Sequence, residues 1–231
     1  MTLLLKLAFL FFMGSIFGWV LELFFRHFTS KEKKWINPGF CKGPYLPIYG
    51  FGLCILYLLS MGESYLPIDN LYLRKAVLLL IMAVMMTAIE FIGGYIFLKY
   101  SHVRLWDYSD MPGNYLGIIC PQFSLIWAAG GALYNLMIHP YIIGAIEWLA
   151  GNLAFSFFIG LFFGFFIIDA IDSTGIYLKI RKWANEHQLT LYYFELKRQL
   201  LEYSPKSSFF NHFRVKEDLA SYLEQIHKKH Q

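Results

Sequence analysis

The sequence predicts an all-α protein, a polytopic membrane helix bundle of about five transmembrane helices that ends in a helical cytoplasmic tail. The first indication is composition: of 231 residues, 57% are hydrophobic and 16% charged, and mean hydropathy is +0.46, whereas soluble domains carry about 25% charged residues. The second is a series of long apolar segments. The third is the net charge of +4, which lies wholly in residues 173–231, because residues 1–172 carry ten basic and ten acidic residues.

The first two apolar segments are Leu7–Phe25 and Pro44–Gly62, and each is long enough, or nearly so, to cross about 30 Å of hydrocarbon. The first follows Lys6 as a secretory signal would, but Glu22 lies inside it and no small-residue cleavage site follows. We therefore interpret it as a retained helix. The second is the least regular, because prolines and glycines crowd its first half: Pro44, Pro47, Gly50 and Gly52.

The remaining apolar segments are Ala76–Leu98, Tyr115–Ile138 and Tyr141–Ile168. Only the His139-Pro140 break separates the last two, which predicts a tight hairpin at that point. Small residues four positions apart predict close contact between helices, within the bundle or, as the alternative, with a second copy of the chain. These glycines are Gly14 with Gly18 and Gly160 with Gly164.

Lysine and arginine are unevenly distributed among the connections. The first connection, the third connection and the C-terminal segment together carry seventeen, and only Lys6, Arg74 and Lys75 lie elsewhere. Basic connections stay in the cytoplasm, so we expect the N-terminus outside and the C-terminus inside the cell. Residues 1–172 are then the transmembrane bundle and residues 173–231 a basic cytoplasmic tail, with helical patterns near Leu189–Glu202 and over 215–226.

The pattern Pro-Gly-x3-Gly-x3-Pro occurs twice, 74 positions apart, beginning at Pro38 and at Pro112. Each copy follows an apolar segment with one glutamate and a loop with one tryptophan. Such self-similarity indicates an internal repeat, which we place at residues 7–62 and 76–138, with residues 141–172 as a fifth helix outside it. Both copies run in the same direction across the membrane under the predicted orientation, so we expect parallel repeats.

Four acidic residues lie inside apolar segments or at their ends, where a charge costs about 2.5–3.5 kcal/mol to insert. Glu22, Glu90 and Asp169 come late in helices predicted to run inward, so they fall in the cytoplasmic third of the membrane, whereas Glu147 lies near the outer end. For Glu22 and Glu90 we favour a functional role. For Asp169 and Glu147 we favour the alternative, a hydrated or structural carboxylate.

The second and fourth apolar segments begin in the same inner layer as Glu22 and Glu90. Proline is tolerated in a first helical turn, and helix N-termini offer free N–H groups with partial positive charge. We therefore expect a cytoplasm-facing polar cavity with Glu22, Glu90, Asp169 and Gln122, in which these N–H groups stabilise the glutamates or bind an anionic group. The helix-start residues around it are Gly39, Gly43, Pro44, Pro47, Trp106, Asp107, Pro112, Gly117 and Pro121.

Several classes of site have no pattern in the sequence. Cys41, Cys54 and Cys120 have neither the spacing of metal ligands nor an even count. The chain has no P-loop and no GxSxG nucleophile motif, and its basic excess is too small to indicate nucleic-acid binding. We therefore predict no enzyme activity, no cofactor, no metal site and no nucleic-acid partner.

Two groups of residues carry a resemblance to a known family. The first is Phe17-Gly18-Trp19-Val20-Leu21-Glu22 with Asn37-Pro38-Gly39-Phe40, Gly43-Pro44 and Pro47-Ile48-Tyr49-Gly50-Phe51-Gly52. The second is Trp106-Asp107-Tyr108-Ser109 with Pro112, Asn114, Gly117, Ile119-Cys120, Phe123-Ser124-Leu125 and Trp127. Together these residues resemble the ABC-transporter type IV membrane family, also labelled CmpB-like, and the resemblance covers over half of the chain.

The resemblance implies a bacterial multi-pass cell-membrane protein catalogued as an ABC-transporter permease, and it adds Trp19, Tyr49 and Gly50 to the candidate residues. We expect a permease-like component with a polar site for a small solute or amphiphile. Its expected partners are the lipid bilayer and either a separate ATPase subunit or a cytoplasmic partner of the tail. The alternative is a non-transporting scaffold or regulator that acts through the tail. A membrane enzyme for lipid-linked substrates ranks last, because no nucleophile accompanies the acids.

Overall fold

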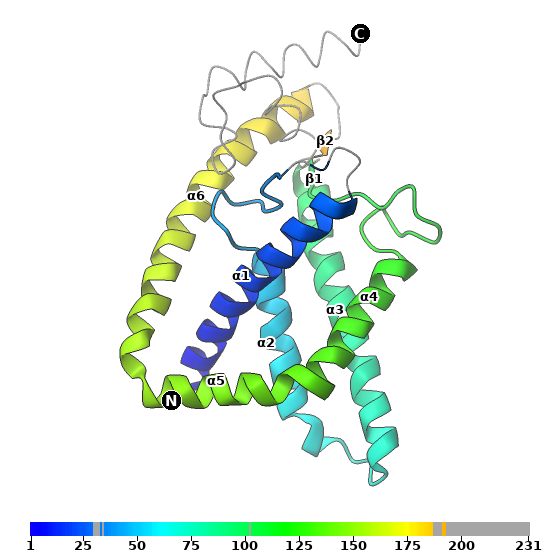
Figure 1. The fold of residues 1–231 in the computed structure, drawn as a ribbon. Helices are drawn as coiled ribbons and strands as arrows, with labels where there is room; N and C mark the ends of the chain where they lie inside the picture. Colours follow the sequence, from blue (N-terminus) through cyan, green and yellow to red (C-terminus); the bar gives the residue numbers. More distant parts are fainter. Residues whose placement is uncertain (30–32, 34, 102, 187–190, 193–231) are drawn as a thin grey trace.

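The computed structural model describes residues 1–29, 33, 35–101, 103–186 and 191–192, and these are mostly helical (Figure 1). The α-helices are α1 (Leu3–Thr29), α2 (Pro47–Met61), α3 (Leu71–Ser101), α4 (Pro121–Leu133), α5 (His139–Gly151) and α6 (Ser156–Glu186). Short 3-10 helices η1 (Glu63–Tyr65) and η3 (Leu153–Phe155) and a π-helix η2 (Tyr134–Ile138) connect them. The two-residue strands β1 (Val103–Arg104) and β2 (Leu191–Tyr192) pair in parallel.

Three of the described helices are long and apolar enough to cross a membrane, over Leu3–Thr29, Leu71–Lys99 and Leu153–Gly175. Helix α2 is apolar but shorter. Large apolar side chains on these helices point away from the protein: Leu21, Leu80 and Phe165 are each more than 60% exposed. Hydrocarbon tails are the environment that such a surface requires. The predicted helical membrane bundle is confirmed.

The long helices alternate in direction, as Figure 1 shows. Helices α1, α3 and α6 run toward one end of the molecule, and α2 and α4 run back from it. The loop before α2, the loop before α4 and the end of α6 therefore lie at the same end, which we call the basic end because it holds most of the lysines and arginines of the described residues. The chain begins at the opposite end.

The predicted hairpin at His139-Pro140 is wrong. The chain there is continuous helix, with η2 leading directly into α5, and α5 runs across the end of the molecule opposite the basic end (Figure 1). The helix that runs back toward the basic end is α6, which starts only at Ser156. Pro140 has no N–H and its ring crowds the carbonyl four residues earlier, and the wider π turn accommodates this defect without ending the helix.

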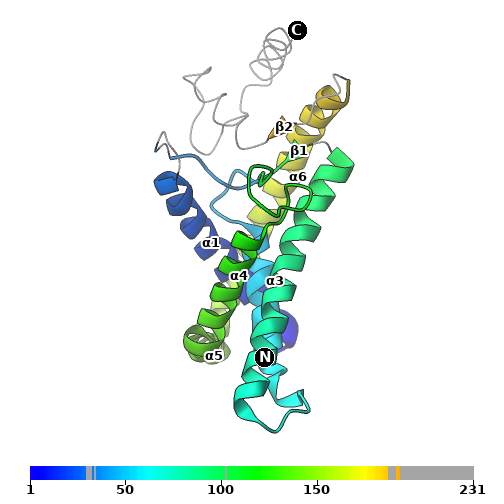
Figure 2. The same cartoon turned by 90° about the vertical axis from the view of Figure 1, so that its right-hand side faces the viewer.

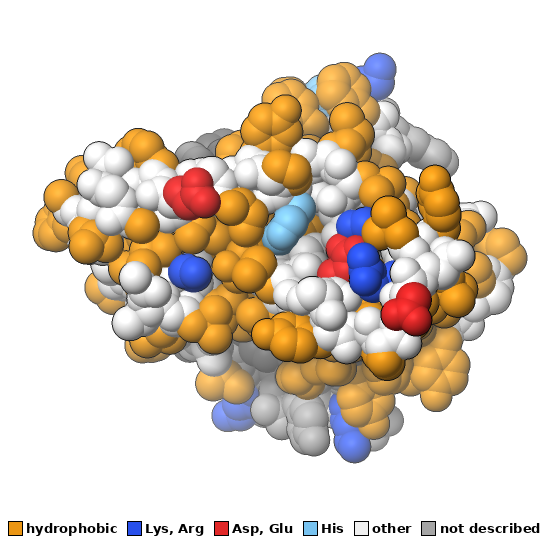
Figure 3. Space-filling model, turned by 90° about the horizontal axis from the view of Figure 1, so that it is seen from below, with side chains coloured by type: hydrophobic (Ala, Val, Ile, Leu, Met, Phe, Trp, Pro, Cys, Tyr) orange, Lys and Arg blue, Asp and Glu red, His pale blue; other side chains and the backbone are white. Residues whose placement is uncertain are grey.

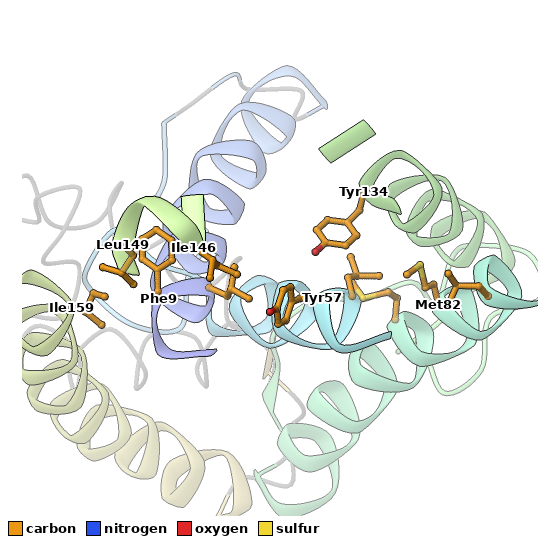
Figure 4. Close-up of a cluster of buried hydrophobic side chains, with 11 residues drawn as sticks. Phe9, Tyr57, Met82, Tyr134, Ile146, Leu149 and Ile159 are labelled. Carbon is orange, nitrogen blue, oxygen red and sulfur yellow. The ribbon is translucent and has the colours of Figure 1, made fainter. Parts of the chain in front are cut away.

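One apolar core joins most of the helices. Its buried members come from α1, α2, α3, η2, α5 and α6, and they surround Met82 of α3 and Leu149 of α5, both fully buried (Figure 4). Ile146 and Leu149 give α5 an apolar side toward this core, whereas its Glu147 is exposed. Helix α5 is therefore packed onto the bundle as a crosspiece.

The two glycine pairs behave differently. A Cβ on Gly18 would lie 2.1 Å from Tyr49 Cγ, and one on Gly14 would lie 2.9 Å from Leu53 Cβ, so the predicted close helix contact is confirmed for this pair, and the partner is α2. A Cβ on Gly160 or Gly164 would meet nothing within 4 Å among the described residues. The prediction of close contact inside the bundle is therefore wrong for the second pair, which faces outward on α6.

The C-terminal expectations are only partly covered by the described residues. Helix α6 continues without a break from residue 172 to Glu186, so the first part of the predicted tail extends the last membrane helix. Leu191–Tyr192 lies inside the predicted helix Leu189–Glu202 but forms β2. The rest of the predicted tail, including the helical pattern over 215–226, lies outside the described residues.

Candidate functional site

Glu90 is a buried carboxyl group on α3, close to the basic end. Its side chain is only 3% exposed. The hydroxyl of Tyr108, from the loop before α4, donates a hydrogen bond of 2.9 Å to Oε1. Trp127 of α4 also approaches this carboxyl group, yet Oε2 has no hydrogen-bond partner of normal geometry. The one hydrogen bond of normal geometry to this buried acid therefore comes from Tyr108, and Oε2 has none.

Glu22 lies late in α1 and has two donors. Arg26, one helical turn further on, brings Nε to 2.7 Å from Oε1. The hydroxyl of Tyr49, in the first turn of α2, donates to Oε2 at 2.8 Å. Both acids therefore receive a tyrosine hydroxyl, and each tyrosine comes from a different part of the chain than the acid it contacts.

The structure brings Glu22 and Glu90 together. Their carboxyl groups interact electrostatically with each other, and Tyr49 interacts with both. We call this group of residues the acidic site: Glu22, Arg26, Tyr49, Glu90, Tyr108 and Trp127. Its members come from α1, α2, α3, α4 and the loop before α4, and helices α3 and α4 run side by side in both views (Figures 1 and 2).

Aromatic rings surround the acidic site. Tyr108 stacks on Phe123 of α4 with ring centroids 4.3 Å apart, and Tyr49 lies against Trp127 at 5.4 Å. Phe25 of α1 meets Phe123 edge-on at 6.4 Å. Burial and the neighbouring Glu90 carboxylate raise the pKa of the Tyr108 phenol, so this hydroxyl stays protonated and can donate to the acid.

Local sequence explains how these side chains reach the site. Pro47 and Pro121 each occupy the first turn of a helix, where a missing N–H costs nothing, so Tyr49 and Phe123 both fall in that first turn. Gly18 has no Cβ, which leaves room for the Tyr49 ring against α1. From there the hydroxyl reaches Glu22, four residues after Gly18 on the same helix face.

Each of the two loops at the basic end is held by the side chain of one asparagine. In the first, the fully buried Asn37 donates to the carbonyls of Cys41 and Lys42 and accepts from the Trp19 indole at 2.9 Å. In the second, Asn114 donates to the carbonyls of Ser109 and Met111, and Gly117 donates to it. Trp19 therefore helps to hold the first loop in place.

The paired glycines of the repeated pattern serve different needs. Gly117 has a φ of +67°, which side-chain-bearing residues adopt at a cost, and a Cβ there would lie 2.3 Å from the Arg104 guanidinium. Gly43 is not in the left-handed region, but a Cβ there would lie 2.3 Å from the Tyr45 ring. Whether the two halves are a true repeat stays a prediction, although both helices that follow begin at the matching prolines, Pro47 and Pro121.

Asp169 forms an anchor apart from the acidic site. It accepts hydrogen bonds from the backbone N–H groups of Lys42 at 3.2 Å and Gly43 at 2.7 Å, from Ser173 Oγ at 3.0 Å, and from the Tyr45 hydroxyl. These donors belong to α6 and the first loop. Figure 1 shows α6 on the far side of α1 from α3 and α4. Asp169 therefore ties α6 to that loop and does not join Glu90.

Other candidate residues lie outside the acidic site. Gln122 is exposed at the start of α4. Asp107 accepts from the backbone N–H of Ser109 and pairs with Arg104 at 3.2 Å, and Trp106 donates to the Ile118 carbonyl. These interactions stabilise the conformation of the second loop, the loop before α4. The glutamates receive tyrosine hydroxyls rather than the helix N-terminal N–H groups that we expected from the sequence.

A second polar cluster lies at the end opposite the basic end. Lys75 of α3 contacts Glu63 at 2.7 Å and Asn135 of η2 at 3.1 Å, and Asn135 donates to Ser60 at 2.9 Å. Figure 3 views this end and shows acidic, basic and histidine side chains among hydrophobic ones. The cluster fastens η2 to α2 and α3. Its buried asparagine carries no signal in the sequence that would have singled it out.

Sequence reasoning missed three members of the acidic site: Arg26, Tyr108 and Trp127. Arg26 was assigned only to a basic loop, although its spacing of four from Glu22 favours an ion pair on one helix. Tyr108 and Trp127 lay within the residues that carry the family resemblance, but nothing local pointed them at Glu90. Within the described residues, no group of three or more histidine, cysteine or acidic side chains forms a metal site.

Comparison with known proteins gives one result. A family model described as "Putative ABC-transporter type IV" matches residues 9–174, which include every member of the acidic site and all helices up to the middle of α6. No curated protein and no solved structure was found to match the chain.

Proposed function

The chain belongs to the ABC-transporter type IV family, and on that basis we propose that it is a permease-like component of a membrane transporter, with the acidic site as its substrate-recognition site. The matched region is the helical membrane bundle itself. The family therefore supports a membrane location and a role in transport, and the acidic site is where we expect that role to be carried out.

The observation that best supports the proposal is the buried Glu90, whose Oε2 has no hydrogen bond of normal geometry. A buried acid without donors is costly, and an ionisable group inside a membrane bundle usually lines a binding site or a pathway. Tyr108 satisfies Oε1, and Oε2 has no hydrogen-bond partner among the described residues. A bound ligand that donates a hydrogen bond would satisfy the second oxygen.

We further propose that the acidic site faces the cytoplasm. It lies at the basic end, which holds eight of the eleven lysines and arginines among the described residues. The positive-inside rule assigns such an end to the cytoplasm. The N-terminus, η1 and α5 are then at the outer surface.

An ATP-driven transporter needs a nucleotide-binding subunit, and this chain has no P-loop. We propose that a separate ATPase binds the same cytoplasmic end. The alternative is a scaffold or regulator that acts through its tail, and most of that tail lies outside the described residues.

The test is to identify what the full-length chain carries. Small molecules and proteins that co-purify with the wild type in mild detergent would be identified by mass spectrometry and compared with those of Glu22→Gln, Glu90→Gln and the exposed control Glu147→Gln. We expect a compound that Glu90→Gln loses and Glu147→Gln keeps, and reduced movement of this compound in membrane vesicles that contain Glu90→Gln. Identical compound profiles and equal vesicle transport in all four proteins would refute the proposal.

A further inference from the structure

We infer that the acidic site binds an organic monocation, a protonated amine carried on an apolar body. This inference rests on the proposed function, because it names the chemical class of the ligand that the same site would recognise. Three features of the site lead to it: its charge, the unpartnered oxygen of Glu90 and the aromatic rings around it.

The charges of the acidic site do not cancel. Its acidic and basic residues are two glutamates and one arginine, and the arginine, Arg26, lies 2.7 Å from Glu22. Apart from the Glu22 carboxyl group, the groups that approach Glu90 are the neutral side chains of Tyr108 and Trp127, and no salt bridge reaches Glu90 among the described residues. Glu90 is thus the acid without a base beside it, and a ligand with a single positive charge would balance the charge of its ionised form.

The free oxygen of Glu90 favours a cation that carries an N–H group. Glu90 is 97% buried, and its Oε2 has no donor in the described part of the chain. A carboxylate oxygen accepts hydrogen bonds and cannot donate them. An ammonium N–H supplies both the missing donor and the missing charge, and a hydrogen bond between two charged groups is stronger than one between neutral groups.

The rings around the site favour an organic cation over a metal ion. Trp127 and Tyr49 lie together at 5.4 Å, and Tyr108 stacks on Phe123 at 4.3 Å. Aromatic faces attract ammonium groups and also bury alkyl chains. A metal ion would need several oxygen or nitrogen ligands, and the described residues contain no cluster of three histidine, cysteine or acidic side chains. The Glu90 carboxylate would bind the ammonium group of an organic amine, and the aromatic rings would contact its apolar body.

Three probes of equal size separate charge from apolar contact: butylammonium chloride, sodium butyrate and butanol. Each would be titrated at constant ionic strength into the full-length chain in lipid nanodiscs, with calorimetry and tryptophan fluorescence as readouts. We expect saturable binding of butylammonium and no saturable binding of butyrate or butanol. Glu90→Gln should weaken butylammonium binding about tenfold or more, and Trp127→Phe should remove the largest part of the fluorescence change.

The controls keep folding apart from binding. Glu147→Gln should bind butylammonium as the wild type does. Glu90→Asp keeps the negative charge and should keep the preference for butylammonium over butyrate, so this variant tests the inference even if Glu90→Gln does not fold. Absence of saturable butylammonium binding, equal binding of butyrate, or unchanged binding in a folded Glu90→Gln would each overturn the inference.

The outcomes also separate this inference from the proposed function. If the compound that co-purifies through Glu90 is neutral or anionic, the recognition site stands and the cation inference fails. If butylammonium binds through Glu90 but vesicle transport is the same in wild type and Glu90→Gln, the cation inference stands and the transport proposal fails.

Discussion

A single hydroxyl connects the second loop to the acid on α3. Tyr108 donates to Glu90 while its ring stacks on Phe123, so this residue supplies both a hydrogen bond and part of the aromatic wall. Glu22 has the equivalent donor in Tyr49. At the scale of residues, the acidic site is two acid–tyrosine pairs that differ in one respect: Glu22 also has a cation, and Glu90 does not.

Replacement of Tyr108 by phenylalanine keeps the ring stack and removes the donor. The buried Glu90 carboxyl then loses its one hydrogen bond of normal geometry, so we expect Tyr108→Phe to lower the free energy of unfolding by about 1–3 kcal/mol. Thermal unfolding in detergent, followed by tryptophan fluorescence, measures the change. Tyr72→Phe is the matched control, because Tyr72 is 85% exposed; an equal loss in both variants would contradict this role for Tyr108.

Sequence alone identified both acids, and the family resemblance added Tyr49, but Arg26, Tyr108 and Trp127 were missed. Glu22 and Glu90 are conspicuous because a charge within an apolar segment is rare. Tyr49, Tyr108 and Trp127 are ordinary residues for a membrane protein with 19% aromatic content. Only the packing of α1, α2, α3 and α4 shows which aromatic side chains face the acids. Asp169 looked similar to the glutamates in the sequence, and its four donors became visible only once the first loop was folded against α6.

At the scale of elements, the contact between α1 and α2 depends on Gly18. In Gly18→Ala the new Cβ would overlap the Tyr49 ring, at 2.1 Å from Cγ, and displace the hydroxyl that binds Glu22. We expect a loss of about 1–3 kcal/mol of unfolding free energy from this overpacking. Gly164→Ala places a Cβ in open space on α6 and should be neutral or slightly stabilising. Thermal unfolding of both variants gives the comparison; equal tolerance of the two changes would contradict the close contact.

Helix α6 depends on Asp169 for its attachment to the first loop. Asp169→Asn replaces an acceptor-only carboxylate by an amide that accepts at one atom, so some of its four hydrogen bonds are lost. We expect α6 to become easier to detach, with a lower unfolding temperature and faster proteolysis in the first loop. Asp69→Asn is the control, because Asp69 is exposed and lies at the opposite end of the molecule from the first loop. If Asp169→Asn unfolds at the same temperature as this control, the hydrogen bonds of Asp169 do not contribute to stability.

The element boundaries show which local rules decide the fold. The proline-led starts of α2 and α4 follow helix-capping chemistry, and they lie three and six residues after the predicted segment starts, Pro44 and Tyr115. The continuous helix at Pro140 was not predicted, because proline was expected to end the helix. The η2 π turn carries the chain past it, and burial of Ile146 and Leu149 then holds α5 against the bundle. Tertiary packing, which the sequence does not display, decided between a hairpin and a crosspiece.

At the scale of the whole molecule, two antiparallel helix pairs, α1 with α2 and α3 with α4, open toward the same end. Each pair contributes one glutamate and one proline-led helix, so the acidic site lies between two similar halves. Helix α6 packs beside α1, and α5 spans the opposite end as a crosspiece (Figure 1). The apolar pattern predicted the bundle well, because lipid-facing helices must be hydrophobic along their length.

The central claim is that both pairs deliver their glutamates to one site on the cytoplasmic side. Cysteines at Trp35, Asp110 and Asp69, all exposed, would be labelled by a membrane-impermeant maleimide in intact cells and in inverted vesicles, in a background without Cys41, Cys54 and Cys120. We predict that Trp35→Cys and Asp110→Cys react only in inverted vesicles and Asp69→Cys only in intact cells. Reaction of Trp35→Cys and Asp110→Cys from opposite sides of the membrane would contradict the account.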